Sequence, residues 1–281
     1  MKRNFLKKIT ALILALGMLA CMSACGSSGS SSSAAEETDA LQRIMEEGKI
    51  VVGIEAAHPP ISNTDTATGE IYGLSVDLIN LYAEKLGVEV EFKQVEWAAL
   101  IPGLTSGDTD VIADSLTRSV PRSAAINLSD PFFLTGTTAI LRADDTRLTS
   151  WEDLNSADVK LGITEGTIYA DLIAEQFPNA EMVTFQSKTE WSEALKAGRI
   201  DCVIEEECTL LDRMEVYPGE FKLFPDDYLS FETYGFAVPY GETGLQYSLN
   251  LFLQEIKING EYAALYEKWT GQTWESGNQG I

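Results

Sequence analysis

The chain has 281 residues and a formal net charge of −23, from 43 acidic and 20 basic residues. Hydrophobic residues make up 45% of it, which is ordinary for a globular protein and excludes disorder over the bulk of the chain. The acidic excess argues against a nucleic acid partner, because phosphate binding needs basic patches. The length allows one large domain or two modest ones.

The first 24 residues have the pattern of an export signal. A basic start precedes an apolar stretch, residues 9–19, that is too short for a comfortable membrane span. Met-Ser-Ala-Cys25-Gly then resembles a lipobox, and Cys21 is the second choice. We expect a signal peptide over residues 1–24 and a lipid on Cys25, with an uncleaved apolar anchor as the alternative. The Ser/Gly/Ala-rich residues 26–35 predict a flexible tether.

The next segments alternate between helix and strand patterns. Residues 36–47 predict a short amphipathic helix, and Lys49–Ile54 predicts a buried strand. The loop after this strand contains His58 and Pro59-Pro60, at the strand end where open α/β sheets bind ligands. His58 is therefore either a ligand contact or a solvated side chain on a rigid loop. It is the single histidine of the chain, and nothing near it in the sequence supports a Ser-His-Asp or Cys-His catalytic set.

A helix over residues 73–87 and a strand over residues 88–95 follow, and Trp97 precedes a helix over residues 101–106. A lone tryptophan usually packs in a core, so core packing and ligand contact stay open for Trp97.

The strongest site pattern lies between Asp110 and Phe133. A short apolar strand leads into Ser115 and Thr117, and Pro121 then places Arg122 near a predicted helix start. A guanidinium there can grip a carboxylate at two points, and Thr117 and the loop around Ser115 can add donors. The alternative is a surface arginine on a strand-to-helix loop.

The second half of the chain repeats the alternation. Strands are predicted at Val159–Ile163 and Met182–Phe185, and helices at Ile168–Phe177 and Trp191–Ala197. Thr167 precedes the first of these helices as a good cap, where backbone amides form an anion site. A long amphipathic helix is expected over residues 245–258.

Two further cysteines, Cys202 and Cys208, match neither a zinc site nor a thioredoxin-type motif. Export permits a disulfide between them, and a buried unbridged pair is equally consistent with the sequence.

These motifs together resemble family 3 extracellular solute-binding proteins, the polar amino acid receptors of ABC importers. The similarity is carried by Asp110-Val-Ile, Thr117, Arg122 and the run from Ser129 to Phe133, and it extends from about residue 48 to about residue 271. Leu128 and Asp114 depart from the family pattern, which usually has Phe and a small residue there.

The resemblance implies a fold and the residue bounds of its two lobes. It implies an α/β, two-lobe periplasmic-binding (Venus-flytrap) fold with mixed sheets, helices on both sheet faces and two hinge crossovers, at Thr137–Arg142 and Phe231–Pro239. The implied first lobe covers residues 48–138 and 236–274, and the second covers residues 139–235. Residues 25–47 would hold the lipidated cysteine, the tether and a leading helix.

The resemblance also implies site residues. Counting five from Asp201 puts Glu206 at the acidic position that receives the ligand ammonium, where the family usually has Asp. The alternative is that the three consecutive glutamates form a solvated face. His58 and Trp97 occupy positions where the family usually has aromatic side chains against the ligand.

Glu55 and Asp114 both end a strand, so both should face the mouth of one cleft, where family residues contact the ligand side chain. Acids there favour a cationic amino acid, unless Arg118 pairs with one of them and cancels the preference.

The function that follows is a lipid-anchored, monomeric amino acid receptor on the extracytoplasmic face of the membrane. Its expected partners are a free amino acid and the permease subunits of an ABC importer, and no catalytic residue, cofactor or metal is expected. The alternatives are an enzyme on the same scaffold, resembling cyclohexadienyl dehydratase with Glu206 or Asp114 as its acid, and an extracellular amino acid sensor.

Overall fold

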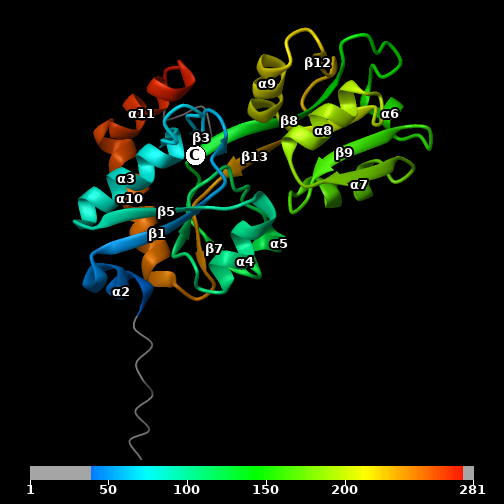
Figure 1. Cartoon of the computed structure of the whole chain (residues 1–281). Helices are drawn as coiled ribbons and strands as arrows, with labels where there is room; N and C mark the ends of the chain where they lie inside the picture. Colours follow the sequence, from blue (N-terminus) through cyan, green and yellow to red (C-terminus); the bar gives the residue numbers. More distant parts are fainter. Residues whose placement is uncertain (1–38, 275–281) are drawn as a thin grey trace, which may run out of the picture. The chain divides into compact units, whose positions relative to one another are not determined.

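The computed structural model describes residues 39–274 (Figure 1). The predicted signal peptide, the cysteines Cys21 and Cys25 and the Ser/Gly/Ala tether lie outside the described residues. Within them, no helix combines the length and the apolar character that a membrane crossing requires.

The first lobe is built on a five-stranded mixed sheet with the strand order β5-β1-β6-β14-β7. Strand β1 runs parallel to β5 and β6, whereas β14 is antiparallel to β6 and β7. The five strands are β1 (Lys49–Ile54), β5 (Glu89–Gln94), β6 (Val111–Ile112), β7 (Ile126–Leu128) and β14 (Ala237–Pro239). A small sheet of β2 (Ala57–His58), β3 (Ser62–Thr64) and β4 (Ile71–Tyr72) follows β1.

Successive residues of a strand point to opposite faces of the sheet, so apolar strand residues give this sheet two apolar faces. Helices cover both of them. Val111 packs into the core under α3, α10 and α11, and its neighbour Ile112 packs into the core on the α4 side. The helices of this lobe are α2 (Ala40–Glu47), α3 (Leu74–Leu86), α4 (Leu100–Thr105), α5 (Val120–Ser123), α10 (Thr243–Asn259) and α11 (Glu261–Thr270).

The second lobe repeats this plan around a sheet with the order β10-β9-β11-β8-β12, in which β13 also pairs with β8. Cys202 and Ile204 face the core beside α6 and α7, and Val203 between them faces the core beside α8 and α9. The elements are β9 (Lys160–Thr164), β10 (Glu181–Phe185), β11 (Cys202–Glu206), β12 (Phe221–Leu223), α6 (Trp151–Leu154), α7 (Tyr169–Gln176), α8 (Lys188–Lys196) and α9 (Glu207–Val216).

Two antiparallel strands join the lobes, β8 (Phe133–Arg142) and β13 (Ser230–Tyr234) (Figure 1). Strand β8 begins at Phe133, earlier than the predicted crossover at Thr137. The α/β two-lobe fold with two crossovers is therefore the fold of the described chain, as predicted. The lobe limits at residues 138/139 and 235/236 stay predictions. The first falls inside β8, and the second lies just after β13.

The start of helix α8 differs from the prediction, and the state of the two cysteines, which the sequence left open, is now given. Ser187 caps α8 by accepting a hydrogen bond from the Glu190 amide at 3.3 Å, so this helix starts at Lys188 and not at Trp191. Cys202 and Cys208 are both free thiols. Cys202 belongs to the second-lobe core, and Cys208 lies 3.7 Å from the Tyr234 hydroxyl.

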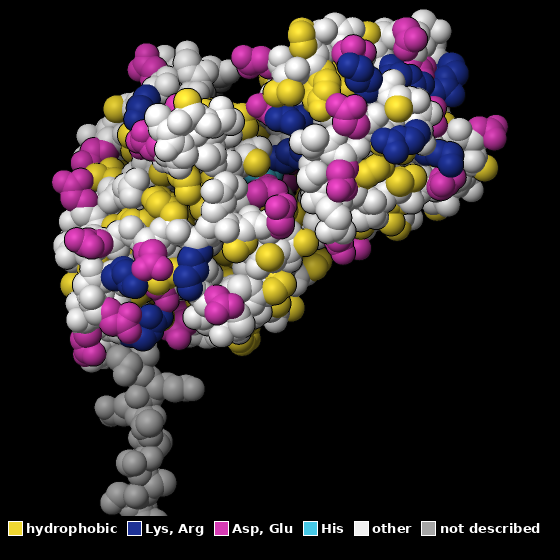
Figure 2. All heavy atoms as spheres, viewed as in Figure 1, with side chains coloured by type: hydrophobic (Ala, Val, Ile, Leu, Met, Phe, Trp, Pro, Cys, Tyr) yellow, Lys and Arg dark blue, Asp and Glu magenta, His cyan; other side chains and the backbone are white. Residues whose placement is uncertain are grey.

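Acidic side chains are spread over the face drawn in Figure 2 and do not gather into one patch. The acidic excess therefore marks no single binding surface on this face, which is hollowed between the two lobes.

Candidate functional site

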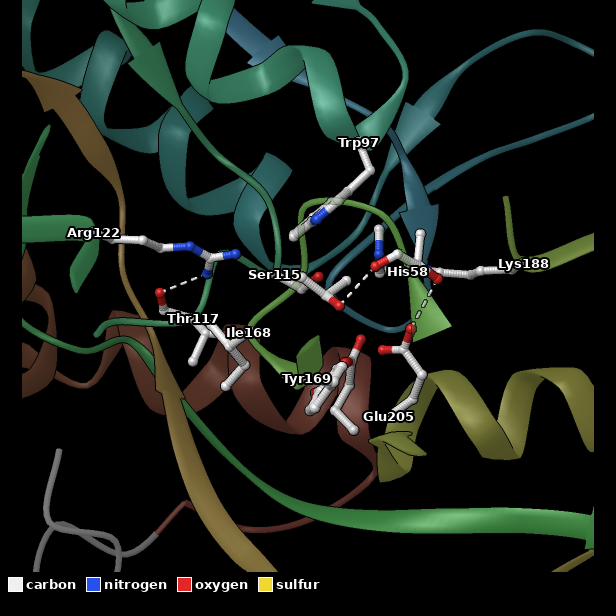
Figure 3. A pocket seen from close by; sticks show the side chains of 12 residues that line it. His58, Trp97, Ser115, Thr117, Arg122, Ile168, Tyr169, Lys188 and Glu205 are labelled. Carbon is white, nitrogen blue, oxygen red and sulfur yellow. Dashed lines mark hydrogen bonds between the residues drawn. The ribbon is translucent and has the colours of Figure 1, made fainter. Parts of the chain in front are cut away.

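A pocket between the lobes is lined by side chains from both of them (Figure 3). The free space left between its side chains is small, about 10 Å³. The lining residues are His58, Trp97, Ser115, Thr117 and Arg122 from the first lobe, and Thr164, Thr167, Ile168, Tyr169, Lys188, Glu205 and Glu206 from the second.

Arg122 forms one end of the pocket. It lies in α5, which Ser119 caps, and its guanidinium is fixed by two backbone carbonyls, Thr117 at 2.8 Å and Gly166 of the second lobe at 3.1 Å. Burial lowers the pKa of Arg122, while the negative groups nearby, Glu232 first, act in the opposite direction. A planar cation held in this way is oriented for a carboxylate.

Ser115 and Thr117 lie beside Arg122 on the same loop. The buried Ser115 hydroxyl has no hydrogen-bond partner within residues 39–274, so it can serve a ligand. The Thr117 hydroxyl donates to the Glu232 carboxyl at 2.5 Å, and its side chain thereby ties the pocket to hinge strand β13.

Trp97 and His58 form an aromatic wall of the first lobe. Their ring centroids are 4.8 Å apart and the rings are tilted by 50°. His58 Nδ1 lies 3.3 Å from both Glu55 and Asp114. Trp97 belongs to the core cluster with Leu100, which confirms core packing, and it also lines the pocket, where its contact with a ligand stays a prediction.

Glu206, at the end of β11, is the ionised acid of the pocket. Burial acts to raise the pKa of Glu206, but electrostatic interactions with His58 and Lys188 and hydrogen bonds with Glu205 and Thr209 lower it to about 2. Its carboxylate accepts the Tyr169 hydroxyl at 2.8 Å and the Thr209 hydroxyl at 2.6 Å. A buried carboxylate here suits a ligand cation.

Glu205 and Lys188 lie at the end of the pocket opposite Arg122 (Figure 3). Burial and the charge of neighbouring Glu206 raise the pKa of Glu205 well above its usual range. Its carboxyl accepts the Thr164 hydroxyl at 2.9 Å. Lys188 Nζ donates to the Ala57 carbonyl of the first lobe at 2.9 Å.

Within residues 39–274, no group of three His, Cys, Asp or Glu side chains is arranged to hold a metal ion. The pocket thus presents a fixed guanidinium from one lobe and a carboxylate with a lowered pKa from the other.

Residues 50–272 match the profile of bacterial extracellular solute-binding proteins, family 3. The chain belongs to this family. It is 30% identical to the ABC transporter glutamine-binding protein GlnH of Bacillus subtilis, over 94% of this chain and 97% of that protein. It is 28% identical to a probable histidine-binding protein of Neisseria gonorrhoeae, over 94% of this chain and 96% of that one.

Solved structures agree with this family membership. An arginine-binding protein mutant from T. maritima superposes with a TM-score of 0.75 at 31% identity, covering 83% of this chain and 100% of that one. The ancestral amino acid-binding protein AncCDT-1, described as a precursor of cyclohexadienyl dehydratase, gives a TM-score of 0.74 at 31% identity, covering 82% and 98%. The relatives of this family 3 protein are amino acid ABC transporter binding proteins.

The structure brings most of the predicted site residues into one pocket. They are Arg122, Thr117, Ser115, Trp97, His58, Thr167 and Glu206. The run of three glutamates is not a solvated face, since Glu205 and Glu206 are buried and Glu207 accepts the Tyr228 hydroxyl at 2.7 Å.

Asp114 does not line the pocket, although the sequence suggested that it faces the cleft mouth. It is fully buried behind His58, where it accepts the amides of Glu55 at 2.8 Å and Ser115 at 2.7 Å and the Ser62 hydroxyl at 2.6 Å. Burial acts to raise the pKa of Asp114, yet His58 and these hydrogen bonds lower it overall. A weaker bond from the amide of Ala56, whose φ is +56°, helps to fix the loop in an unfavourable conformation.

Glu55 is also outside the pocket lining and lies in a neighbouring groove, with its carboxyl against His58. The expected competitor for these acids, Arg118, instead donates to the Ser129 carbonyl at 2.8 Å. Thr167 lines the pocket, but its hydroxyl donates to the Thr164 carbonyl at 2.8 Å and does not cap α7, whose first turn follows Ile168.

Sequence analysis missed Lys188, Glu205, Tyr169 and the hinge acid Glu232. Lys188 lay outside the predicted helix, which began at Trp191. The capping pattern Ser187-x-x-Glu190 was the signal that could have extended that helix to include it. Tyr169 joins two of the acids, because its hydroxyl lies 2.8 Å from Glu206 and 2.6 Å from Glu232.

Proposed function

We propose that this chain is a lipid-anchored, monomeric extracytoplasmic receptor that delivers an amino acid to an ABC importer. Arg122, assisted by Ser115 and Thr117, would bind the α-carboxylate of the ligand, and Glu206 would bind its ammonium group. Trp97, His58 and Thr167 complete the contacts, and Glu55 and Asp114 act behind His58 as positioning residues. The observation that carries the proposal is that a fixed guanidinium and an ionised carboxylate line one small pocket from opposite lobes.

This division of charge explains how a ligand would change the protein. A zwitterion touches both lobes only when they are close, so it binds the closed arrangement better and shifts the hinge toward it. Two contacts already cross between the lobes, from Arg122 to the Gly166 carbonyl and from Lys188 to the Ala57 carbonyl. Closure also excludes water, which strengthens both ion pairs.

The relatives support an amino acid as the ligand class, since those described above are named for binding glutamine, histidine and arginine. An enzyme on this scaffold is the rival, supported by the likeness to a precursor of cyclohexadienyl dehydratase. Calorimetry of the full chain with the common L-amino acids tests the proposal, and we expect saturable binding with the ligand recovered unchanged. Loss of the ligand into a new product would favour the enzyme, and no binding at all would refute the receptor.

The lipid anchor is tested separately, in a bacterial host that processes lipoproteins. Cys25→Ala should move the protein from the membrane fraction to the soluble fraction, because a lipid on Cys25 would be its stable attachment. Cys21→Ala is the matched control and should leave the protein on the membrane. The reverse result would move the lipid to Cys21.

A further inference from the structure

Lys188 is a buried cation in the pocket that the carboxylate and ammonium grips do not use. It is the first residue of α8, the residue is 7% exposed, and its side chain extends into the pocket from the side opposite Arg122 (Figure 3). Lysine is rarely buried to this extent unless its ammonium group is paired.

The ammonium group of Lys188 has three donors. Within residues 39–274 its one hydrogen-bond partner is the Ala57 carbonyl at 2.9 Å, and neither Glu205 nor Glu206 forms a hydrogen bond with it. Glu205 and Glu206 act on it at longer range, through their charges. Two donors of a buried cation therefore remain for an acceptor that enters the pocket.

The geometry of the pocket says which part of a ligand reaches Lys188. Arg122 and Lys188 lie at opposite ends, and Trp97 and Tyr169 lie on either side of the space between them (Figure 3). An amino acid whose α-carboxylate binds Arg122 directs the end of its side chain toward Lys188, His58 and Glu205.

The groups at this end favour an acceptor over a cation. A guanidinium or ammonium there would meet the charge of Lys188 at short range in a pocket closed to water, where like charges repel strongly. Glu205 does not offset this, because burial and Glu206 raise the pKa of Glu205 and so disfavour its charged form. Asp114, which the sequence suggested as an attraction for a cationic side chain, is buried behind His58. Its carboxylate oxygens already accept hydrogen bonds from the Glu55 amide and the Ser62 hydroxyl.

We propose that Lys188 is a specificity-determining residue that selects amino acids whose side chain ends in an amide or carboxylate oxygen, and that it disfavours cationic side chains. This inference rests on the proposed function, since it places the α-carboxylate of the ligand at Arg122. The cationic ligand suggested by Glu55 and Asp114 in the sequence is the competing outcome.

The test is calorimetry of the full-length protein with L-glutamine, L-glutamate, L-arginine and L-lysine. We expect the wild type to bind glutamine or glutamate at least 10-fold more tightly than arginine or lysine. In Lys188→Met, which keeps the aliphatic stem, that preferred ligand should lose roughly 10- to 100-fold in affinity, the range for one charged hydrogen bond, and arginine should lose none. Lys196→Met, on the exposed side of the same helix, is the matched control and should leave the ranking unchanged.

The outcomes separate the two proposals. Tighter binding of arginine or lysine by the wild type overturns the role of Lys188 and leaves the receptor intact, and this ranking decides even if the variant does not fold. An equal loss for all ligands in Lys188→Met also overturns it, since Lys188 would then only join the lobes through Ala57. If no amino acid binds the wild type, the proposed function itself fails.

Discussion

The two ends of the pocket are built in different ways. At the Arg122 end the cation is held by two backbone carbonyls, and the hydroxyl of Ser115 lies beside it on the same loop. At the Lys188 end the cation is held by one carbonyl of the other lobe, beside a carboxyl group, Glu205, whose pKa is raised by burial and by Glu206.

If the proposed function holds, the Arg122 end would be common to all ligands of this protein and the Lys188 end would select among them. Every amino acid brings the same carboxylate, so a rigid, fully oriented guanidinium suits the Arg122 end. Side chains differ, and a flexible ammonium with donors to spare suits the end that reads them. Changes at the first end should therefore affect all ligands alike, and changes at the second should alter their ranking.

The largest effect is expected from Arg122→Ala. Removing the guanidinium leaves the ligand carboxylate without its charged partner in a closed pocket, which costs about 3–5 kcal/mol, or roughly 1,000-fold in affinity. Arg122→Lys should also be severely weakened, because a point charge cannot reproduce the two-point grip. Calorimetry with any amino acid that the wild type binds measures both.

The exposed Arg199, which does not line the pocket, provides the control, and Arg199→Ala should bind as the wild type does. A melting curve separates lost binding from lost folding. Wild-type affinity in a folded Arg122→Ala protein would contradict the assignment of this end.

The residues at the Arg122 end could be predicted from the sequence because they lie close together in the chain. Pro121 fixes a helix start next to Arg122, and Ser115 and Thr117 lie on the same short loop. Strand and helix periods likewise gave the strand Lys49–Ile54 at the limits that the structure has. Resemblance supplied the two-lobe plan and the position of Glu206.

The residues at the Lys188 end could not be predicted in this way, because contacts between segments far apart in the sequence bring them together. The Ala57 carbonyl that holds Lys188 lies 131 residues away in sequence, and Glu232 meets Thr117 across 115 residues. Asp114 was misplaced for the same reason. A strand end predicts that a side chain lies near the cleft, but not that Ser62 and the loop amides will bury it.

A smaller effect, still shared by all ligands, is expected from Glu206→Gln. The ligand ammonium would lose its charged partner, at a cost of about 2–3 kcal/mol, or roughly 30- to 150-fold in affinity. The amide of glutamine can still accept one of the two hydroxyls, of Tyr169 and Thr209, that now bind the carboxylate. Calorimetry with the preferred ligand and with a second, weaker one should give similar losses.

Glu207→Gln is the matched control, because Glu207 follows in sequence but bonds Tyr228 outside the pocket. Its affinities should match the wild type. A larger loss in Glu205→Gln than in Glu206→Gln would transfer the ammonium partner to Glu205 and remove the contrast between the two ends.

The smallest effect concerns stability and tests the state of the Lys188 end directly. The pKa of Glu205 is raised in the folded protein. Above pH of about 4.5 the unfolded chain therefore releases the Glu205 proton while the folded protein keeps it. The unfolded state then binds fewer protons, so this group's contribution to stability falls as pH rises toward the folded pKa. Glutamine has no proton to lose, and Glu205→Gln should lack this fall.

We therefore expect Glu205→Gln to melt near the wild-type temperature at pH 4 and a few degrees above it at pH 7.5, a gain of about 1 kcal/mol. Thermal melts across this range measure the difference, and Glu175→Gln at an exposed position should follow the wild type throughout. A variant that is less stable than the wild type at pH 7.5 and equal to it at pH 4 would mean that Glu205 is ionised when folded. The Lys188 end would then carry a carboxylate able to pair with a cationic side chain, and the contrast between the two ends would rest on Lys188 alone.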